Sequence, residues 1–215
     1  MIKAIIFDMD GCLADTEPLI CAAAIQGLAE YGVTARPEDF IPFVGRGDDL
    51  YVGGVGEKYG LPYDARQKER VYEIYMDIVA RDGKPFPGVP ELLAAVHARG
   101  IRMAVGSSAD KPKVEANIRA LGVPRSWFEV VVDGTMVANK KPAPDLFLKA
   151  AEMLGLEPSD CCVVEDAVHG VEAARAAGMR SVGVANTLPA AELSMADVVR
   201  NATGDVTLAD LGIEN

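Results

Sequence analysis

Short apolar runs alternate with helical segments along most of this chain, and this rhythm limits the fold more than any other feature. Beyond residue 86, each apolar run is long enough for one strand, and each helical segment ends at a glycine, a common helix stop signal. The runs are IRMAV (101–105), EVVV (129–132), CCVV (161–164) and SVGV (181–184), and the helical segments are 89–100, 113–122, 145–155 and 169–178. This alternation predicts an α/β fold, a doubly wound, Rossmann-like parallel sheet with helices on both faces. The first apolar run, KAIIF (3–7), should join the sheet near its centre.

The stretch from residue 16 to residue 85 breaks this rhythm. It contains two long helical segments, PLICAAAIQGLAEYG (18–32) and DARQKERVYEIYMDIVARDG (64–83), and strand signals between them are weak. Glycine and proline cluster in GVGEKYGLP (54–62) and GKPFPG (83–88). We therefore predict an α-helical cap domain at 16–85, inserted into an α/β core domain formed by 1–15 and 86–215.

Charge and composition argue against several classes of function. The chain has 21 basic and 32 acidic residues, a net charge of −11, so we expect no nucleic-acid partner, because phosphate backbones are bound by clustered Lys and Arg. The apolar runs are far shorter than the ~20 residues of a membrane span, and the first residues lack the features of a signal peptide. We therefore expect no membrane association, a cytoplasmic location, and a monomer or weak dimer. The four cysteines form no C-x-x-C motif, which argues against zinc.

Polar residues follow the strand-like runs where each strand should end. In chain order these residues are Asp8 and Asp10, Ser107 and Ser108, Lys140 and Lys141, and Glu165 and Asp166. In doubly wound sheets, ligands bind outside the carboxyl ends of the strands. All four groups should therefore converge on one rim of the sheet.

Crowded carboxylates at such a rim need a positive partner. Two unit charges ~4 Å apart repel by roughly 4 kcal/mol at an effective dielectric of ~20. Taken singly, each motif also fits a plain role, such as a helix cap or a lysine in a solvated loop. In combination, the acids favour Mg²⁺, while a lysine, a hydroxyl group and helix N-termini favour a phosphate group. An aspartate free to act as nucleophile then predicts aspartyl-phosphate chemistry.

Four segments of the chain resemble, in order and spacing, the four motifs of the haloacid dehalogenase superfamily. These segments are FDMDGCLADTE (7–17), VGSS (105–108), KKPAPD (140–145) and VVEDAVHG (163–170). The stretches DGCLADTE, KPAPDLF and VEDAVHGVEAARAAGM are most similar to the β-phosphoglucomutase-like phosphatase branch. The resemblance covers essentially the whole chain, including a helical cap after the first motif.

The resemblance implies a role for each acidic residue. Asp8 would attack phosphorus, and Asp10 would protonate the leaving oxygen and then act as general base. Mg²⁺ would be held by the Asp8 carboxylate, the Asp10 main-chain carbonyl and Asp166, with Glu165 binding directly or through water. The metal would serve as a Lewis acid and screen the aspartate from the phosphate.

The resemblance also implies a set of phosphate-binding residues. Ser107, with Ser108 beside it, and Lys141 would bind the transferring phosphoryl group. Lys140 is the adjacent alternative, but the family's lysine immediately precedes proline, which favours Lys141. Dehalogenase chemistry is not expected, because that branch lacks an aspartate at the position of Asp10.

One cap segment bears on the substrate. RGDDL (46–50) resembles the segment in which the mutases of this branch use an arginine to grip the substrate's second phosphate. Arg46 in that role favours a substrate with a distal anionic group. The alternative is that Arg46 pairs with Asp48 or Asp49 at the surface.

Two departures from the mutase pattern decide the predicted reaction. Ile20 stands where those mutases carry a histidine, and Asp110 would repel a second phosphate, although Lys111 beside it compensates in part. We therefore predict a Mg²⁺-dependent phosphatase that hydrolyses a small phosphorylated metabolite, either a sugar phosphate or a phosphosugar acid, through an aspartyl-phosphate on Asp8. The alternatives are a β-phosphoglucomutase-type mutase and a non-catalytic module that binds phosphate and Mg²⁺.

Overall fold

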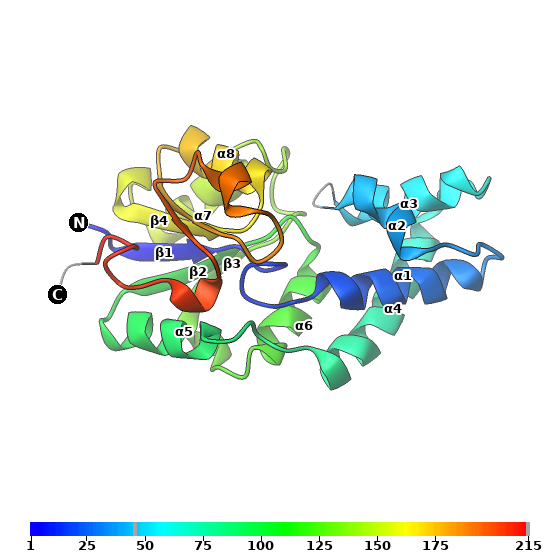
Figure 1. Ribbon diagram of the computed structural model, residues 1–215, viewed down its shortest axis with the longest axis horizontal. Coiled ribbons are helices and arrows are strands. Elements are labelled where there is room, and N and C mark those ends of the chain that lie inside the picture. The colour runs from blue at the N-terminus through cyan, green and yellow to red at the C-terminus, as the bar shows by residue number, and fades with distance from the viewer. Residues whose placement is uncertain (45–46, 214–215) are drawn as a thin grey trace.

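The computed structural model describes residues 1–44 and 47–213. Six parallel strands form one sheet in the order β3-β2-β1-β4-β5-β6, and a separate group of helices lies beside it (Figure 1). The strands are β1 (Ala4–Phe7), β2 (Arg102–Gly106), β3 (Phe128–Val132), β4 (Cys161–Glu165), β5 (Arg180–Val184) and β6 (Val198–Arg200). The predicted doubly wound sheet is confirmed, with β1 at its centre between β2 and β4. The short edge strand β6 was not predicted, because its three half-buried residues carry no clear apolar run.

The strands bury both faces of the sheet, which explains why their sequences read as unbroken apolar runs. Along β1, Ile5 and Phe7 face one core layer, while Ala4 and Ile6 face the other, as the two-residue period of a strand requires. The first layer is covered by α5 (Val89–Ala98) and α6 (Lys111–Ala120), and the second by α7 (Asp145–Leu154) and α8 (Val168–Ala176) (Figure 1). Short 3₁₀ turns complete the core: η2 (Arg125–Trp127), η3 (Pro158–Asp160), η4 (Ala190–Leu193) and η5 (Thr203–Asp205).

The helix after β2 begins earlier than the sequence suggested. We expected it to start at Lys113, but α6 starts at Lys111 with Pro112 in its first turn. Proline is tolerated there because the first N–H groups of a helix have no partner within the helix. Lys113 therefore lies inside the helix rather than at its start.

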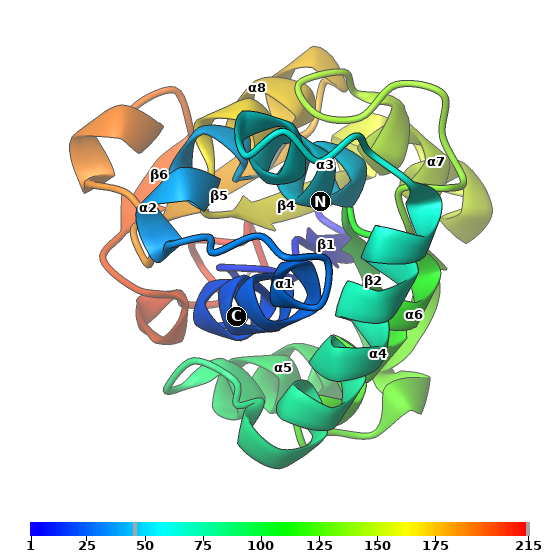
Figure 2. The same ribbon diagram turned by 90° about the vertical axis from the view of Figure 1, so that its right-hand side faces the viewer.

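The inserted segment forms the helical cap and has a core of its own. It consists of α1 (Glu17–Ala29), α2 (Pro37–Phe40), η1 (Ile41–Phe43), α3 (Asp48–Lys58) and α4 (Ala65–Asp82). Figure 2 shows this side of the molecule, with α1 and α4 next to each other and α3 above them. Buried Ile20, Leu28, Phe40 and Tyr75 belong to its apolar cluster. None of the described helices is long and apolar enough to cross a membrane.

Helix α3 was missed because its glycines suggested a loop. A Cβ at Gly53 would lie 2.8 Å from the Tyr63 ring, and one at Gly54 would lie 2.4 Å from the Phe43 ring. These glycines allow the aromatic rings to pack directly on the helix backbone. Close packing thus outweighs the low helix propensity of glycine.

Helix α6 packs against both the core sheet and the cap. Its Val114 and Ile118 pack against the sheet, whereas Ala116 packs in the cap cluster with α4. The two chain connections between cap and core also run together, since the Phe86 N–H donates to the Leu13 carbonyl over 3.0 Å. The exact boundaries at 15/16 and 85/86 stay a prediction.

A pair of neighbouring residues on α7 tests the assignment of its buried face. We expect Phe147→Ala to lower the free energy of unfolding by about 3–5 kcal/mol, because its ring is fully buried against the sheet. Leu148→Ala, at a side chain that is 39% exposed, is the control and should change it by less than about 0.5 kcal/mol. Urea unfolding measures both, and equal losses would contradict the assignment.

Candidate active site

The turn after β1 fixes Asp8 at the base of a cavity. The Asp8 N–H donates to the Val164 carbonyl of β4 over 2.9 Å. Gly11 has a φ of +79°, and a Cβ there would lie 2.3 Å from Asp166 Oδ2, so the turn requires glycine. Asn186 Nδ2 donates to the Gly11 carbonyl over 2.8 Å and holds the turn from the other side. The Asp8 side chain is buried and lines the cavity.

Asp8 forms a cluster of three buried carboxylates with Glu165 and Asp166. One oxygen from each lies within 4.8 Å of the others, a spacing that could hold a metal ion. Thr187 Oγ1 donates to Asp166 Oδ2 over 2.5 Å and orients that carboxylate. A set made only of carboxylate oxygens suits a hard cation such as Mg²⁺. The Asp10 side chain is not part of this cluster, and its main-chain carbonyl as a metal ligand stays a prediction.

The environment of the cluster disfavours three negative charges. Burial raises the pKa of Asp8, and Lys141 opposes that shift. Burial and the charge of Asp8 raise the pKa of Glu165 well above its usual range, and they raise the pKa of Asp166 to about 8. A bound divalent cation would stabilise the ionised carboxylates, so the cluster fits a metal.

Among the lysines in the part of the chain that the structure describes, Lys141 is the one that pairs with this cluster. Its Nζ donates to Asp8 Oδ1 and lies 3.5 Å from Glu165 Oε2. It also lies over the Phe147 ring, 4.9 Å from the centroid, and its side chain is buried. Lys140 points instead towards the cap, where its Nζ would lie 3.1 Å from a Cβ at Gly47. The structure therefore places Lys141 rather than Lys140 beside Asp8.

Ser107 and Ser108 follow β2 and line the same cavity. The Ser107 N–H donates to the Val132 carbonyl, and its Oγ accepts from the Ala109 N–H over 3.1 Å. The Ser108 Oγ is buried and has no hydrogen-bond partner within 1–44 and 47–213. Because buried polar atoms are normally paired, this hydroxyl is available to a ligand.

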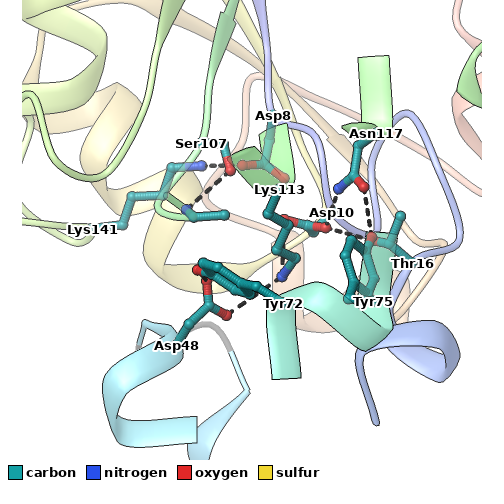
Figure 3. Close-up of polar contacts among 11 residues, drawn as sticks. Asp8, Asp10, Thr16, Asp48, Tyr72, Tyr75, Ser107, Lys113, Asn117 and Lys141 are labelled. Carbon is teal, nitrogen blue, oxygen red and sulfur yellow. Dashed lines mark hydrogen bonds and ion pairs between the residues drawn. The ribbon is translucent and has the colours of Figure 1, made fainter. Parts of the chain in front are cut away.

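Asp10 is held by side chains that the sequence reading did not identify (Figure 3). Thr16 Oγ1 and Asn117 Nδ2 donate to Asp10 Oδ1 over 2.5 and 2.9 Å, and Lys113 Nζ lies 3.5 Å from Asp10 Oδ2. Lys113 and Asn117 are both buried and lie four residues apart on one face of α6. The four-residue spacing of these polar residues beside Val114 was the one signal in the sequence that could have identified them. The same spacing equally fits the solvent-exposed face of a helix.

The cavity lies between core and cap and has a volume of 470 Å³. The cap contributes both apolar side chains, such as Ile20 and Phe43, and acidic ones, Glu17 and Asp48. Burial raises the pKa of Glu17 to about 7, although Lys113 opposes the shift. Arg46, which we expected to bind substrate, lies outside the described residues.

Comparison with known proteins identifies the family. Residues 2–178 match the model of the haloacid dehalogenase-like hydrolases, and the chain belongs to this family. It is 42% identical to the Arabidopsis thaliana chloroplastic protein Suppressor of Quenching 1 over 98% of its own length, but it covers only 20% of that protein. It is 37% identical to fructose-1-phosphate phosphatase YqaB of Escherichia coli, over 84% of this chain and 95% of YqaB.

A solved structure is similar over the whole fold. A variant of CbbY from Rhodobacter sphaeroides, in complex with xylulose 1,5-bisphosphate, has a TM-score of 0.88 and 31% identity, covering 98% of this chain and 99% of that one. The expected family is therefore confirmed. Together, the family match and the phosphatase relative assign the chain to the phosphoric monoester hydrolases of this family.

Gly170 tests the position of Glu165. Alanine normally favours a helix over glycine by about 1 kcal/mol, but a Cβ at Gly170 would lie 1.9 Å from Glu165 Oε1. We expect Gly170→Ala to displace Glu165 and weaken Mg²⁺ binding about 10- to 100-fold, as measured by calorimetric titration. Arg175→Ala, at an exposed position of the same helix, should leave Mg²⁺ affinity unchanged. Unaltered affinity in Gly170→Ala would mean that Glu165 does not support the metal.

Glu17 should make the stability of the protein depend on pH. Folding raises its pKa from 4.5 to about 7, so between these values the folded protein binds more protons than the unfolded chain. The free energy of unfolding should therefore fall as pH rises through this window. In urea unfolding at pH 5 and pH 8, Glu17→Gln should reduce this loss by about 1–3 kcal/mol. Glu57→Gln, at an exposed cap position, should not; the same pH dependence in Glu17→Gln and wild type would refute the prediction.

Proposed function

We propose that the protein is a Mg²⁺-dependent phosphatase that hydrolyses a small phosphorylated metabolite, a sugar phosphate or phosphosugar acid, through an aspartyl-phosphate on Asp8. The observation that carries this proposal is the buried cluster of Asp8, Glu165 and Asp166 with Lys141 beside it. The name of the E. coli relative and the bisphosphate bound to CbbY support a phosphorylated sugar as substrate.

The chemistry would proceed in two steps. In the first, an Asp8 oxygen attacks phosphorus, the bond from phosphorus to the substrate oxygen breaks, and Asp10 gives a proton to that oxygen. In the second, Asp10 takes a proton from water, the water oxygen attacks phosphorus, and phosphate leaves Asp8. Mg²⁺ held by Asp8, Glu165, Asp166 and the Asp10 main-chain carbonyl would screen the charge of the phosphoryl group.

The phosphoryl group itself would be bound by Lys141, Ser107 and Ser108. Lys141 is already a partner of Asp8, so it can neutralise a phosphoryl oxygen near the nucleophile without moving far. The unpaired Ser108 Oγ supports a role as a donor to the same group. These three residues come from two different loops, so they can contact different oxygens.

The mutase alternative depends on whether the cavity can bind a second phosphate group. Ile20 lines the cavity and offers no proton-transfer group, which favours hydrolysis. Repulsion of a second phosphate by Asp110 is a weaker argument against a mutase than the sequence suggested, because Lys68 of the cap pairs with Asp110 over 2.9 Å. This partner comes from the cap rather than from neighbouring Lys111.

The decisive assay is phosphate release with Mg²⁺ from a panel of three- to six-carbon phosphosugars and phosphosugar acids. Asp8→Asn should reduce release by about 10³-fold or more, because the nucleophile is lost. Asp15→Asn, at an exposed position of the same loop, is the control and should stay active, and removal of Mg²⁺ with EDTA should abolish activity.

Other outcomes point to the alternatives. Conversion of β-glucose 1-phosphate to glucose 6-phosphate, dependent on glucose 1,6-bisphosphate and without phosphate release, would identify a mutase. No turnover and no phosphoenzyme with acetyl phosphate would identify a binding module. Full activity in Asp8→Asn would refute the proposed nucleophile.

A further inference from the structure

A buried lysine of the core contacts both the proposed acid–base residue and the cap. Lys113 on α6 is 4% exposed, and its Nζ lies 3.5 Å from Asp10 Oδ2 and 3.5 Å from Asp48 Oδ1. Asp48 is the first residue of the cap helix α3. Figure 3 shows the lysine between the two carboxylates. One ammonium group is thus shared by a residue of the reaction centre and a residue of the cap.

The cap supports this arrangement through two tyrosines of α4. Tyr72 OH donates to Asp48 Oδ2 over 2.6 Å, which orients the carboxylate that faces Lys113. Tyr75 OH donates to Asn117 Oδ1 over 2.5 Å, and Asn117 in turn donates to Asp10. The Tyr75 ring also lies 5.8 Å from Lys113 Nζ. Both groups of α6 that hold Asp10 are therefore themselves held by the cap.

The burial of Lys113 makes its two carboxylate partners interdependent. A buried ammonium group is costly unless it is paired, and at 3.5 Å neither contact has the length of a close charged hydrogen bond. Movement of the cap that withdraws Asp48 would remove one of these two partners, so the ammonium group of Lys113 could shift towards Asp10. The position of the cap and the position of the Asp10 carboxylate are consequently linked through one side chain.

We propose that Lys113 is a positioning residue that sets the orientation of Asp10 according to the position of the cap. The proposal rests on the proposed function only in taking Asp10 as the residue that transfers the proton. With the cap as observed, Thr16 and Asn117 hold Oδ1 of Asp10 and Lys113 faces Oδ2. Proton transfer needs hydrogen-bond distance to the leaving oxygen, and a misplacement of about 1 Å can cost about 10² in rate.

The leaving group of the substrate separates this role from a merely structural one. The alkoxide of an alkyl phosphate is a poor leaving group, so its departure needs the proton from Asp10. The p-nitrophenolate released from p-nitrophenyl phosphate is a stable anion, so its departure does not need that proton. The ratio of kcat/KM for the two substrates therefore reports the placement of Asp10. A general loss of folding or of active enzyme would lower both values equally and leave the ratio unchanged.

The test compares Lys113→Met with Lys111→Met, at an exposed position two residues earlier on the same helix. With fructose 1-phosphate and p-nitrophenyl phosphate as substrates, Lys113→Met should lose about 10- to 100-fold in kcat/KM for the first and less than about threefold for the second. Lys111→Met should match the wild type on both. An unchanged ratio in Lys113→Met, with an active wild type, would overturn this inference alone. A wild type that cleaves neither substrate and forms no phosphoenzyme would overturn the proposed function and this inference with it.

A cap variant provides the second arm, and it carries the test if Lys113→Met does not fold. Asp48→Asn keeps the acceptor for Tyr72 but removes the charge that faces Lys113. It should change the ratio in the same direction by a smaller factor. The double variant should be no worse than Lys113→Met alone, because the two residues act through one contact. A normal ratio in Asp48→Asn, or additive losses in the double variant, would overturn the link between cap and Asp10.

Discussion

The repulsion among Asp8, Glu165 and Asp166 is the constraint on which the rest of the site depends. The three carboxylates meet because β1 and β4 are neighbouring parallel strands, so residues that follow both strands lie at one rim. Lys141 offsets part of their charge from a loop that follows β3. A buried cluster of carboxylates that is incompletely neutralised favours a bound cation. The same excess of negative charge would make the cluster unfavourable if its role were only to stabilise the fold.

The backbone around the cluster is shaped by the same requirement. Gly11 and Gly170 lie where a Cβ would collide with Asp166 and Glu165 respectively, so main chain packs directly against these two carboxylates. Close main-chain packing leaves little freedom for the carboxylates to move apart. The crowding of the carboxylates is therefore built into the fold.

Residues at strand ends could be predicted from the sequence, whereas residues on helix faces could not. The positions of Asp8, Ser107 and Asp166 followed from parallel strands alone, because every such strand delivers its next residue to the same rim. Lys113 reaches the cavity only because α6 packs between sheet and cap, a tertiary arrangement that no local pattern encodes. Helix α3 was missed for a similar reason, since its glycines are explained by rings that come from elsewhere in the chain.

Charge balance also bears on the proposed role of a metal at the site. Asp8, Glu165 and Asp166 carry three negative charges when ionised, and Lys141 supplies one positive charge, which leaves an excess that would repel a phosphate dianion. Burial raises the pKa of Asp8 and so disfavours its charged form, although Lys141 opposes that shift. A divalent cation would offset both effects, since it would stabilise the ionised carboxylates and reduce the repulsion of phosphate. In the proposed mechanism, a bound divalent cation would therefore favour both an ionised Asp8 and the approach of the phosphoryl group.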